Sequence, residues 1–75
     1  MMEKFIKILA NIKNVPTSKI KLDHQLIEDL MLSSLDFAAL IMEFESQFRI
    51  AIDIKTFVSL RTVKELRDYI KSLIC

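Results

Sequence analysis

Hydrophobic and polar positions alternate with a helical period in three segments of the chain. In the first segment, apolar side chains recur at i, i+3, i+4 and i+7, at Phe5, Ile8, Leu9 and Ile12. This spacing places them on one face, so a helix is predicted over Met2–Lys13, with its lysines forming a solvated face. Asn14 suits the C-cap because asparagine tolerates the left-handed conformation, and Pro16 disfavours continuation of the helix.

A second helix is predicted from Ser33 or Ser34 to about Phe48. Ser33 suits the N-cap, and Asp36 three residues later completes a capping-box pattern, in which each side chain accepts a hydrogen bond from the other residue's backbone N–H. The core-facing stripe of this helix comprises Phe37, Leu40, Ile41, Phe44 and Phe48. A short helical turn is predicted around Ile54–Leu60.

The last helix is predicted to begin after Thr62, because Thr62 and Glu65 repeat the capping-box spacing. Its buried face comprises Val63, Leu66, Ile70 and Leu73. Between the first two helices, Val15–Leu32 has no sustained period. Four residues in it are spaced like anchors that hold a loop on a core: Val15, Ile20, Leu26 and Leu30. A loop of this length without structure of its own is uncommon unless it is functional.

These elements predict an all-α protein, a small four-helix bundle of three main helices and a short third helix, with a long first loop. The 75 residues leave room for a single domain, residues 1–75. Apolar residues make up 52% of the chain, and the absence of glycine makes most of them bulky. So small a core cannot bury them all, and contiguous apolar surface left exposed usually marks a docking site.

The composition excludes several classes of function. With one His, one Cys and no Gly, the chain cannot form a His/Cys metal cluster or a glycine-rich phosphate-binding loop. No nucleophile–base–orienter set can be assembled, so an enzyme is not expected. A net charge of +1 does not indicate nucleic-acid binding, and the longest apolar run, Phe37–Met42, is too short to span a membrane. With no targeting segment and no internal disulfide, a cytoplasmic protein is expected.

One run carries the chemistry, Glu28-Asp29-Leu30-Met31-Leu32-Ser33-Ser34-Leu35-Asp36. It resembles the phosphopantetheine attachment site of acyl carrier proteins, which reads roughly D-L-G-x-D-S-L-D in that family. The resemblance extends over nearly the whole chain without a gap, and Asp36 favours the acyl carrier branch over the peptidyl carriers. Matching positions outside the run are Val15, Ile20, Phe44, Phe48, Ile52 and Leu60-Arg61-Thr62-Val63.

The resemblance implies a carrier and not an enzyme. Ser34 would hold a covalent 4′-phosphopantetheine arm, donated from coenzyme A by a phosphopantetheinyl transferase, and the arm would carry an acyl or related carboxylic group as a thioester. Further implied partners are an acyl-loading enzyme and downstream synthases or acyltransferases of fatty acid or polyketide biosynthesis. The carrier is expected to be a monomer. A serine in the first turn of a helix suits this role, since free N–H groups and the helix dipole stabilise a phosphodiester there.

Two residues depart from the family pattern. Ser33 stands where the family has aspartate, which removes a negative charge that the transferase reads. Met31 stands where the family has glycine, which makes the approach to Ser34 bulkier. On these grounds an alternative function stays open, a carrier-like helical protein-interaction domain that never receives the cofactor.

The second helix is apolar on two faces. Leu35, Ala38, Ala39 and Met42 follow helical spacing, offset from the core stripe. Either this helix is buried on nearly all sides, or the strip is exposed beside Ser34, where the corresponding strip of acyl carrier proteins docks partner enzymes. The docking residues implied are Leu35, Asp36, Ala38, Met42, Glu43 and Glu45. Fewer acids than is usual for carriers of fatty-acid synthesis indicate a specialised rather than a housekeeping carrier.

The resemblance also implies a cargo cleft between the second and third helices, lined by Phe44, Phe57, Leu60 and Leu66. Phe57 stands where the family commonly has a small residue, and Phe44 where it commonly has leucine. Two phenyl rings would fill much of the cleft, because protein interiors are packed near crystal density. Short or polar cargo, or cargo held outside the core, is therefore expected.

Overall fold

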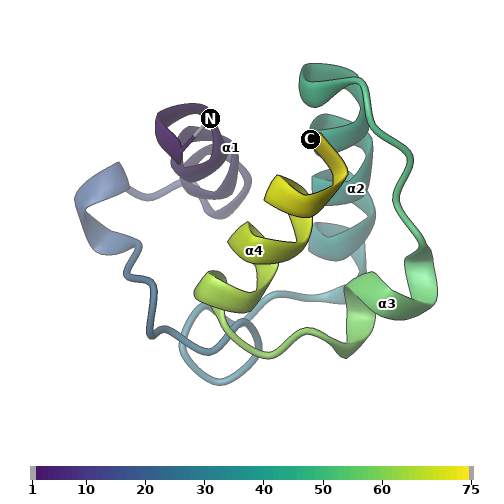
Figure 1. Ribbon diagram of the computed structural model, residues 1–75. Coiled ribbons are helices and arrows are strands. Elements are labelled where there is room, and N and C mark those ends of the chain that lie inside the picture. The colour runs from purple at the N-terminus through teal and green to yellow at the C-terminus, as the bar shows by residue number, and fades with distance from the viewer. Residues whose placement is uncertain (1, 75) are drawn as a thin grey trace.

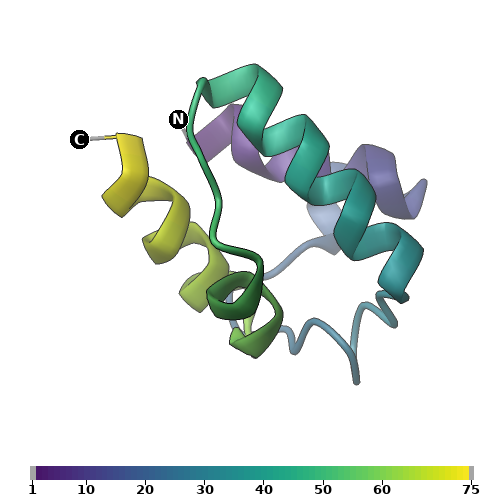
Figure 2. The ribbon, with the colours of Figure 1, turned by 90° about the vertical axis from the view of Figure 1, so that its right-hand side faces the viewer.

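The computed structural model describes residues 2–74 and confirms the all-α four-helix prediction. Its helices are α1 (Met2–Lys13), α2 (Ser34–Phe48), α3 (Ile54–Ser59) and α4 (Val63–Ile74), with a 3₁₀ turn, η1, at Thr17–Lys19. α1 and α2 pack against each other, and α4 lies across one side of this pair (Figures 1 and 2). The short helix α3 lies between α2 and the start of α4. Within residues 2–74 no helix is long and apolar enough to cross a membrane.

Aromatic rings join the helices into one core. The Phe5 and Phe44 rings stack with centroids 5.4 Å apart and planes 11° apart, which ties α1 to α2. Phe57 meets Phe37 and Phe44 edge-on, at 6.0 and 6.3 Å between centroids, which ties α3 to α2. Such pairs contribute about 0.5–1.5 kcal/mol beyond the area they bury. The largest fully buried side chains are Phe5, Phe44, Phe57, Leu9, Leu26, Leu40, Leu66, Ile70 and Val63.

The long first loop is held by backbone hydrogen bonds to the start of α4. The N–H groups of Val63 and Lys64 donate to the carbonyl oxygens of His24 and Leu22, at 3.0 and 2.9 Å. In return, the Leu26 N–H donates to the Arg61 carbonyl at 2.7 Å. The loop therefore satisfies donors of the first turn of α4 that have no acceptor within the helix. Hydrogen bonds to the start of α4 therefore help to hold this loop in place.

The predicted anchors of this loop are only partly confirmed. Ile20 and Leu26 are buried and Leu30 packs against the core at partial exposure, but the prediction for Val15 is wrong, since 37% of its surface is exposed. The Val15 N–H instead donates to the Ala10 carbonyl at 3.0 Å and helps to end α1. Its position is fixed by the helix end, so its side chain is not drawn into the core.

The predicted caps also differ in outcome. Thr62 caps α4, because its Oγ1 accepts a hydrogen bond from the Glu65 N–H at 3.1 Å. The Glu65 carboxylate does not complete a capping box, because it accepts from the Arg61 N–H at 2.7 Å.

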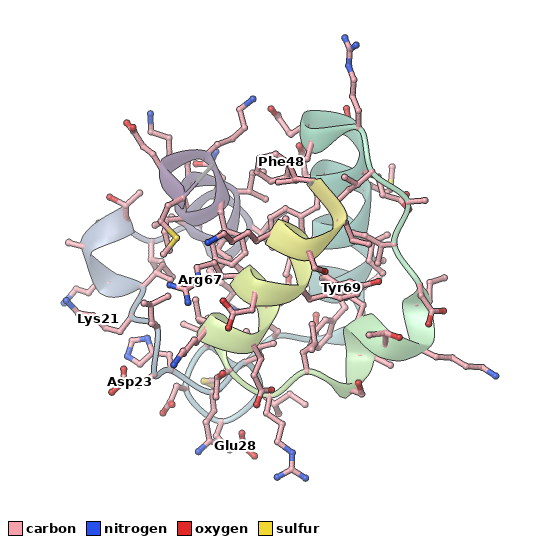
Figure 3. All side chains as sticks on the ribbon, in the orientation of Figure 1. Lys21, Asp23, Glu28, Phe48, Arg67 and Tyr69 are labelled. Atoms are coloured by element: carbon pink, nitrogen blue, oxygen red, sulfur yellow. The ribbon has the colours of Figure 1, made fainter. Side chains whose placement is uncertain are left out.

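Tyr69 reaches from α4 toward the segment that leads into α3, where its hydroxyl accepts from the Asp53 N–H at 3.0 Å (Figure 3).

Three non-glycine residues in the described range have left-handed backbone, Asn14, Met31 and Arg49, with φ of 57°, 56° and 55°. Asn14 and Arg49 end α1 and α2, where a left-handed residue commonly terminates a helix. Met31 ends no helix and lies three residues before Ser34. A side chain with a Cβ is strained in this conformation and glycine is not, which explains physically why the resembled motif has glycine here.

Met31→Gly is expected to raise the free energy of unfolding by about 0.5–1 kcal/mol. The substitution removes a left-handed penalty of about 1–2 kcal/mol, and the greater freedom of glycine in the unfolded chain offsets part of this gain. Urea denaturation measures the change. Met31→Ala is the matched control, because it removes the exposed side chain but keeps the Cβ. Equal stabilisation by both substitutions would contradict the strain at Met31.

Candidate functional site

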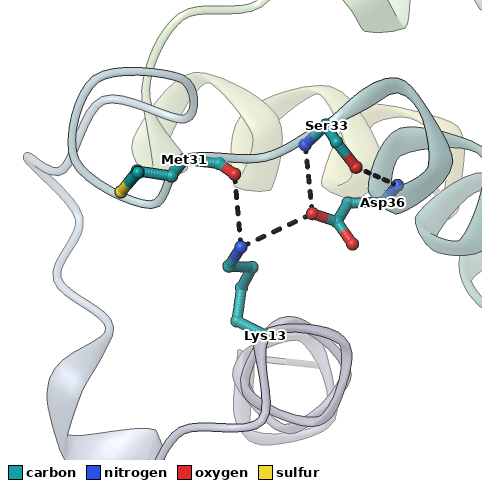
Figure 4. Close-up of polar contacts among 4 residues, drawn as sticks. All are labelled: Lys13, Met31, Ser33 and Asp36. Carbon is teal, nitrogen blue, oxygen red and sulfur yellow. Dashed lines mark hydrogen bonds and ion pairs between the residues drawn. The ribbon is translucent and has the colours of Figure 1, made fainter.

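The two adjacent serines at the head of α2 have different surroundings, and Figure 4 shows those of Ser33. The Ser33 hydroxyl accepts a hydrogen bond from the Asp36 N–H at 3.2 Å, and Asp36 Oδ2 accepts from the Ser33 N–H at 3.0 Å. The predicted capping box is thus confirmed. Ser34, the first residue of α2, is exposed, and its hydroxyl makes no hydrogen bond to another of residues 2–74. Both serines are exposed, but Ser33 caps the helix, whereas the Ser34 side chain takes no part in the cap.

The surroundings of Ser34 fit a phosphate ester with an extended arm. Ser34 and Leu35 occupy the first turn of α2, where backbone N–H groups lack helical acceptors and the helix dipole favours negative charge. A groove of about 490 Å³ has Ser34 in its lining and gives an attached group room to lie along the protein. It is lined by Ile27, Leu32, Ser34, Phe37, Ala38, Ile41, Ile54 and Val58.

The four residues predicted to line a cargo cleft do not line this groove. Phe44, Phe57 and Leu66 are fully buried in the core, and Leu60 is half-buried and borders a separate pocket of about 340 Å³. Ile27, Ile54 and Val58 line the groove although the sequence pattern did not predict them there. A signal for them existed, because they are large apolar residues outside the predicted core stripes.

The predicted docking strip lies on the surface. Leu35 and Met42 are 82% and 71% exposed, and Ala38 is also exposed, so α2 is not buried on nearly all sides. Among the acidic residues of the predicted docking set, Glu43 is exposed, while Asp36 and Glu45 are partly buried. The Glu45 carboxylate accepts a hydrogen bond from the Ile52 N–H at 2.9 Å, so it also fixes the connection from α2 to α3.

Lys13 is a member of the site that the sequence analysis missed. The expectation that the α1 lysines form a solvated face is wrong for Lys13, whose Nζ lies 3.2 Å from the Met31 carbonyl oxygen and 3.4 Å from Asp36 Oδ2. Its side chain is 23% exposed, against 64% for Lys7 in its pair with Glu3. Lys13 is the last residue of α1, and that helix end lies beside the head of α2 (Figure 4).

The pKa of Asp36 is held below its ordinary value of 3.8. The main cause is the hydrogen bond from the Ser33 N–H. Burial opposes the shift, and the positive charge of Lys13 adds to it. A carboxylate with a lowered pKa stabilises the folded state at pH above the ordinary value, and this contribution is lost as pH falls through the folded-state pKa.

The first turn of α2 is therefore expected to loosen on acidification below pH 3.8 as Asp36 becomes protonated. Carbon-detected NMR of the Asp36 carboxyl group, followed together with the amide signal of Ser33, measures both events. Asp36→Asn serves as the control, because the amide cannot titrate. A pH dependence of the Ser33 signal that persists unchanged in this variant would contradict the assignment to Asp36.

The geometry defines a small helical protein that presents a serine hydroxyl beside an apolar groove, and comparison with known proteins identifies its family. Residues 3–70 match the family model described as phosphopantetheine attachment site. The acyl carrier protein of Aster yellows witches'-broom phytoplasma (strain AYWB) is 40% identical over 68 residues, which cover 91% of this chain and 90% of the relative. The chain therefore belongs to the acyl carrier protein family, whose members are non-catalytic carriers.

Two further relatives are similar over nearly their whole length. The acyl carrier protein of Buchnera aphidicola subsp. Schizaphis graminum (strain Sg) is 36% identical over 70 residues, which cover 93% of this chain and 89% of the relative. The acyl carrier protein of Syntrophobacter fumaroxidans (strain DSM 10017 / MPOB) is 34% identical over 70 residues, which cover 93% of this chain and 86% of the relative.

In the described part of the chain, no group of three His, Cys, Asp or Glu residues could hold a metal ion.

Proposed function

We propose that this chain carries acyl or related carboxylic groups as thioesters on a 4′-phosphopantetheine arm attached to Ser34. The observation that supports Ser34 as the attachment residue is its exposed position at the head of α2, next to a Ser33 hydroxyl that is engaged in the capping box. When bound, the arm supplies a terminal thiol for thioester chemistry. The protein supplies position: Ser34 fixes the start of the arm, and the first turn of α2 stabilises its phosphate charge.

Intact-mass measurement tests the proposal directly. The protein is incubated with coenzyme A, Mg²⁺ and a phosphopantetheinyl transferase of broad specificity, and it should gain the mass of one phosphopantetheine. Peptide mapping should then assign the added mass to Ser34. An unchanged mass would favour the alternative function, a carrier-like interaction domain that is never modified.

The proposed partners are a phosphopantetheinyl transferase, an acyl-loading enzyme and downstream synthases or acyltransferases. The proposed docking surface is the exposed strip of Leu35, Ala38 and Met42 with Glu43, and Asp36 and Glu45 add charge at its border. Contiguous exposed apolar surface beside a functional group commonly serves recognition. Flexible Met42 suits a surface that has to fit several partners.

A specialised rather than a housekeeping role is part of the proposal. α2 carries Asp36, Glu43 and Glu45 but has Ser46 and Gln47 where acids are common in carriers of fatty-acid synthesis, and Arg49 follows the helix. Association by electrostatic steering should therefore be weaker, and its rate should depend less on salt. The cargo is proposed to be short or polar, or to rest in the groove beside Ser34, because Phe44 and Phe57 fill the adjoining core.

Met42→Glu is expected to leave the fold intact and to lower kcat/KM of the transferase by about tenfold, because it puts a charge into the apolar strip. Since Met42 is 71% exposed, the new carboxylate stays hydrated, and stability should change by less than about 0.5 kcal/mol. Asn11→Glu, at an exposed site on α1, adds the same charge away from the strip and is the control. A sharp fall in the melting temperature of Met42→Glu, or equal losses of rate in both variants, would contradict docking at Met42.

A further inference from the structure

Lys13 connects two helices that meet at the attachment site. Its Nζ, at the end of α1, donates to the Met31 carbonyl oxygen of the first loop at 3.2 Å and to Asp36 Oδ2 of α2 at 3.4 Å (Figure 4). The same Oδ2 atom accepts from the Ser33 N–H at 3.0 Å. A single ammonium group thus bonds to the residues on both sides of Ser33 and Ser34.

The segment that Lys13 contacts is under strain. Met31 holds a left-handed backbone with φ of 56°, in which a Cβ is unfavourable. Leu32, directly after it, is buried, and its N–H donates to the Leu26 carbonyl at 3.1 Å. Such a conformation persists only where surrounding contacts hold it. The hydrogen bond from Lys13 to the Met31 carbonyl is one of these contacts.

The Lys13–Asp36 ion pair is also less exposed to solvent than the Lys7–Glu3 pair of α1. The side chains of Lys13 and Asp36 are 23% and 26% exposed, whereas those of Lys7 and Glu3 are 64% and 86% exposed. Salt and water screen a partly buried pair less, and its geometry is less mobile. Lys13 can therefore hold the capping-box residue Asp36 in place against the end of α1, whereas the exposed Lys7 pairs only with Glu3 of its own helix.

We propose that Lys13 is a positioning residue for cofactor attachment: it fastens the end of α1 to Met31 and Asp36 and so orients Ser34 for the modifying enzyme. This inference rests on the proposed attachment at Ser34. Lys13 acts through the backbone of Met31 and the carboxylate of Asp36, and not on the Ser34 hydroxyl itself.

Three variants test the role of Lys13 in the full chain. Lys13→Met removes the ammonium but keeps an unbranched apolar side chain, Lys13→Arg keeps a charged donor, and Lys7→Met makes the same charge change elsewhere on α1. We expect Lys13→Met to lower kcat/KM for phosphopantetheine transfer from coenzyme A by about tenfold, because small misplacements of a reacting group cost rate steeply. Lys13→Arg should restore most of the rate, and Lys7→Met should match the wild type. Intact mass follows transfer, and circular dichroism confirms that each variant is folded.

Amide hydrogen exchange at Ser33 provides a second readout that requires no cofactor. If Lys13 positions this segment, Lys13→Met accelerates exchange of the Ser33 N–H while amides in the middle of α2 keep their protection. If Lys13→Met proves unstable, the same measurements are made on Lys13→Met combined with Met31→Gly, in which glycine relieves the strain. This double variant should still load slowly, because the bond to Asp36 is missing.

Loading of folded Lys13→Met at the wild-type rate would overturn the positioning role, as would an equal loss in Lys7→Met. Failure of the proposed function is a separate result, seen when the wild-type protein gains no mass with any transferase. In that event the role in attachment falls with the proposed function, and Ser33 exchange reports only whether Lys13 orders the head of α2. Unchanged protection in Lys13→Met overturns the positioning role in either case.

Discussion

Ser34→Ala is expected to abolish loading with phosphopantetheine and to leave the helical content unchanged. The substitution removes the only atom of residue 34 that can form the phosphate ester. Alanine is a good helix former, and Ser33 still provides the cap through its 3.2 Å bond from Asp36. Intact mass after incubation with transferase and coenzyme A measures the loading, and circular dichroism measures the fold.

Ser33→Ala is the matched control for that experiment. It should lower the free energy of unfolding by about 1 kcal/mol, as the loss of a serine N-cap does, and it should still be loaded. The two variants thus separate a capping hydroxyl from a reacting one. A Ser34→Ala protein that still gains the cofactor mass, now on Ser33, would contradict the assignment of Ser34.

Phe57→Ala is expected to lower the free energy of unfolding by about 3–5 kcal/mol, the usual cost of deleting a buried aromatic ring. Phe57 is fully buried and packs on both Phe37 and Phe44, so its loss leaves a cavity lined by rings. This is a large share of the ~4–11 kcal/mol expected for a domain of this size. Urea denaturation measures it. Val58→Ala is the control on the same helix. Because Val58 is 52% exposed, this variant should lose little of the free energy of unfolding.

Substitution of Phe57 also tests the proposal that long acyl chains do not enter the core. In the wild-type carrier a long acyl chain should cause only small NMR shifts at Phe44 and Phe57 and no rise in melting temperature, because the rings leave little space. Phe57→Leu, a milder truncation, should allow the long chain to enter, with larger shifts and a higher melting temperature than its short-chain form. Large shifts and a rise in melting temperature in the wild type would contradict the restriction.

The helices and the exposed serine at the head of α2 could be predicted because their signals are local in sequence. Apolar spacing set the span of α1, and the Ser33–Asp36 pair marked the start of α2 within one turn. Ser34 was proposed as the attachment residue from a short motif of neighbouring residues, and the exposed apolar strip followed from a second helical stripe. Each of these inferences needed only residues a few positions apart, over which helix geometry is nearly fixed.

Features that depend on how distant segments meet could not be predicted. Lys13 and Asp36 are 23 positions apart, and nothing in the pattern of α1 distinguishes Lys13 from its exposed lysines. The residues lining the groove come from the loop, α2 and α3, so the groove exists only once these are packed. Val15 was mistaken for an anchor because an apolar residue two positions after a helix can serve the helix end instead.

The hydrogen bonds between the first loop and α4 also bear on the order of folding. Leu22 and His24 meet Lys64 and Val63 across more than half of the chain, so this closure joins segments about as far apart in sequence as Phe5 and Phe44. During synthesis, α1 and α2 are made before Val63 and Lys64, whose N–H groups fasten the loop. The wall of the groove contributed by Ile27 therefore lacks this fastening until the start of α4 has been made.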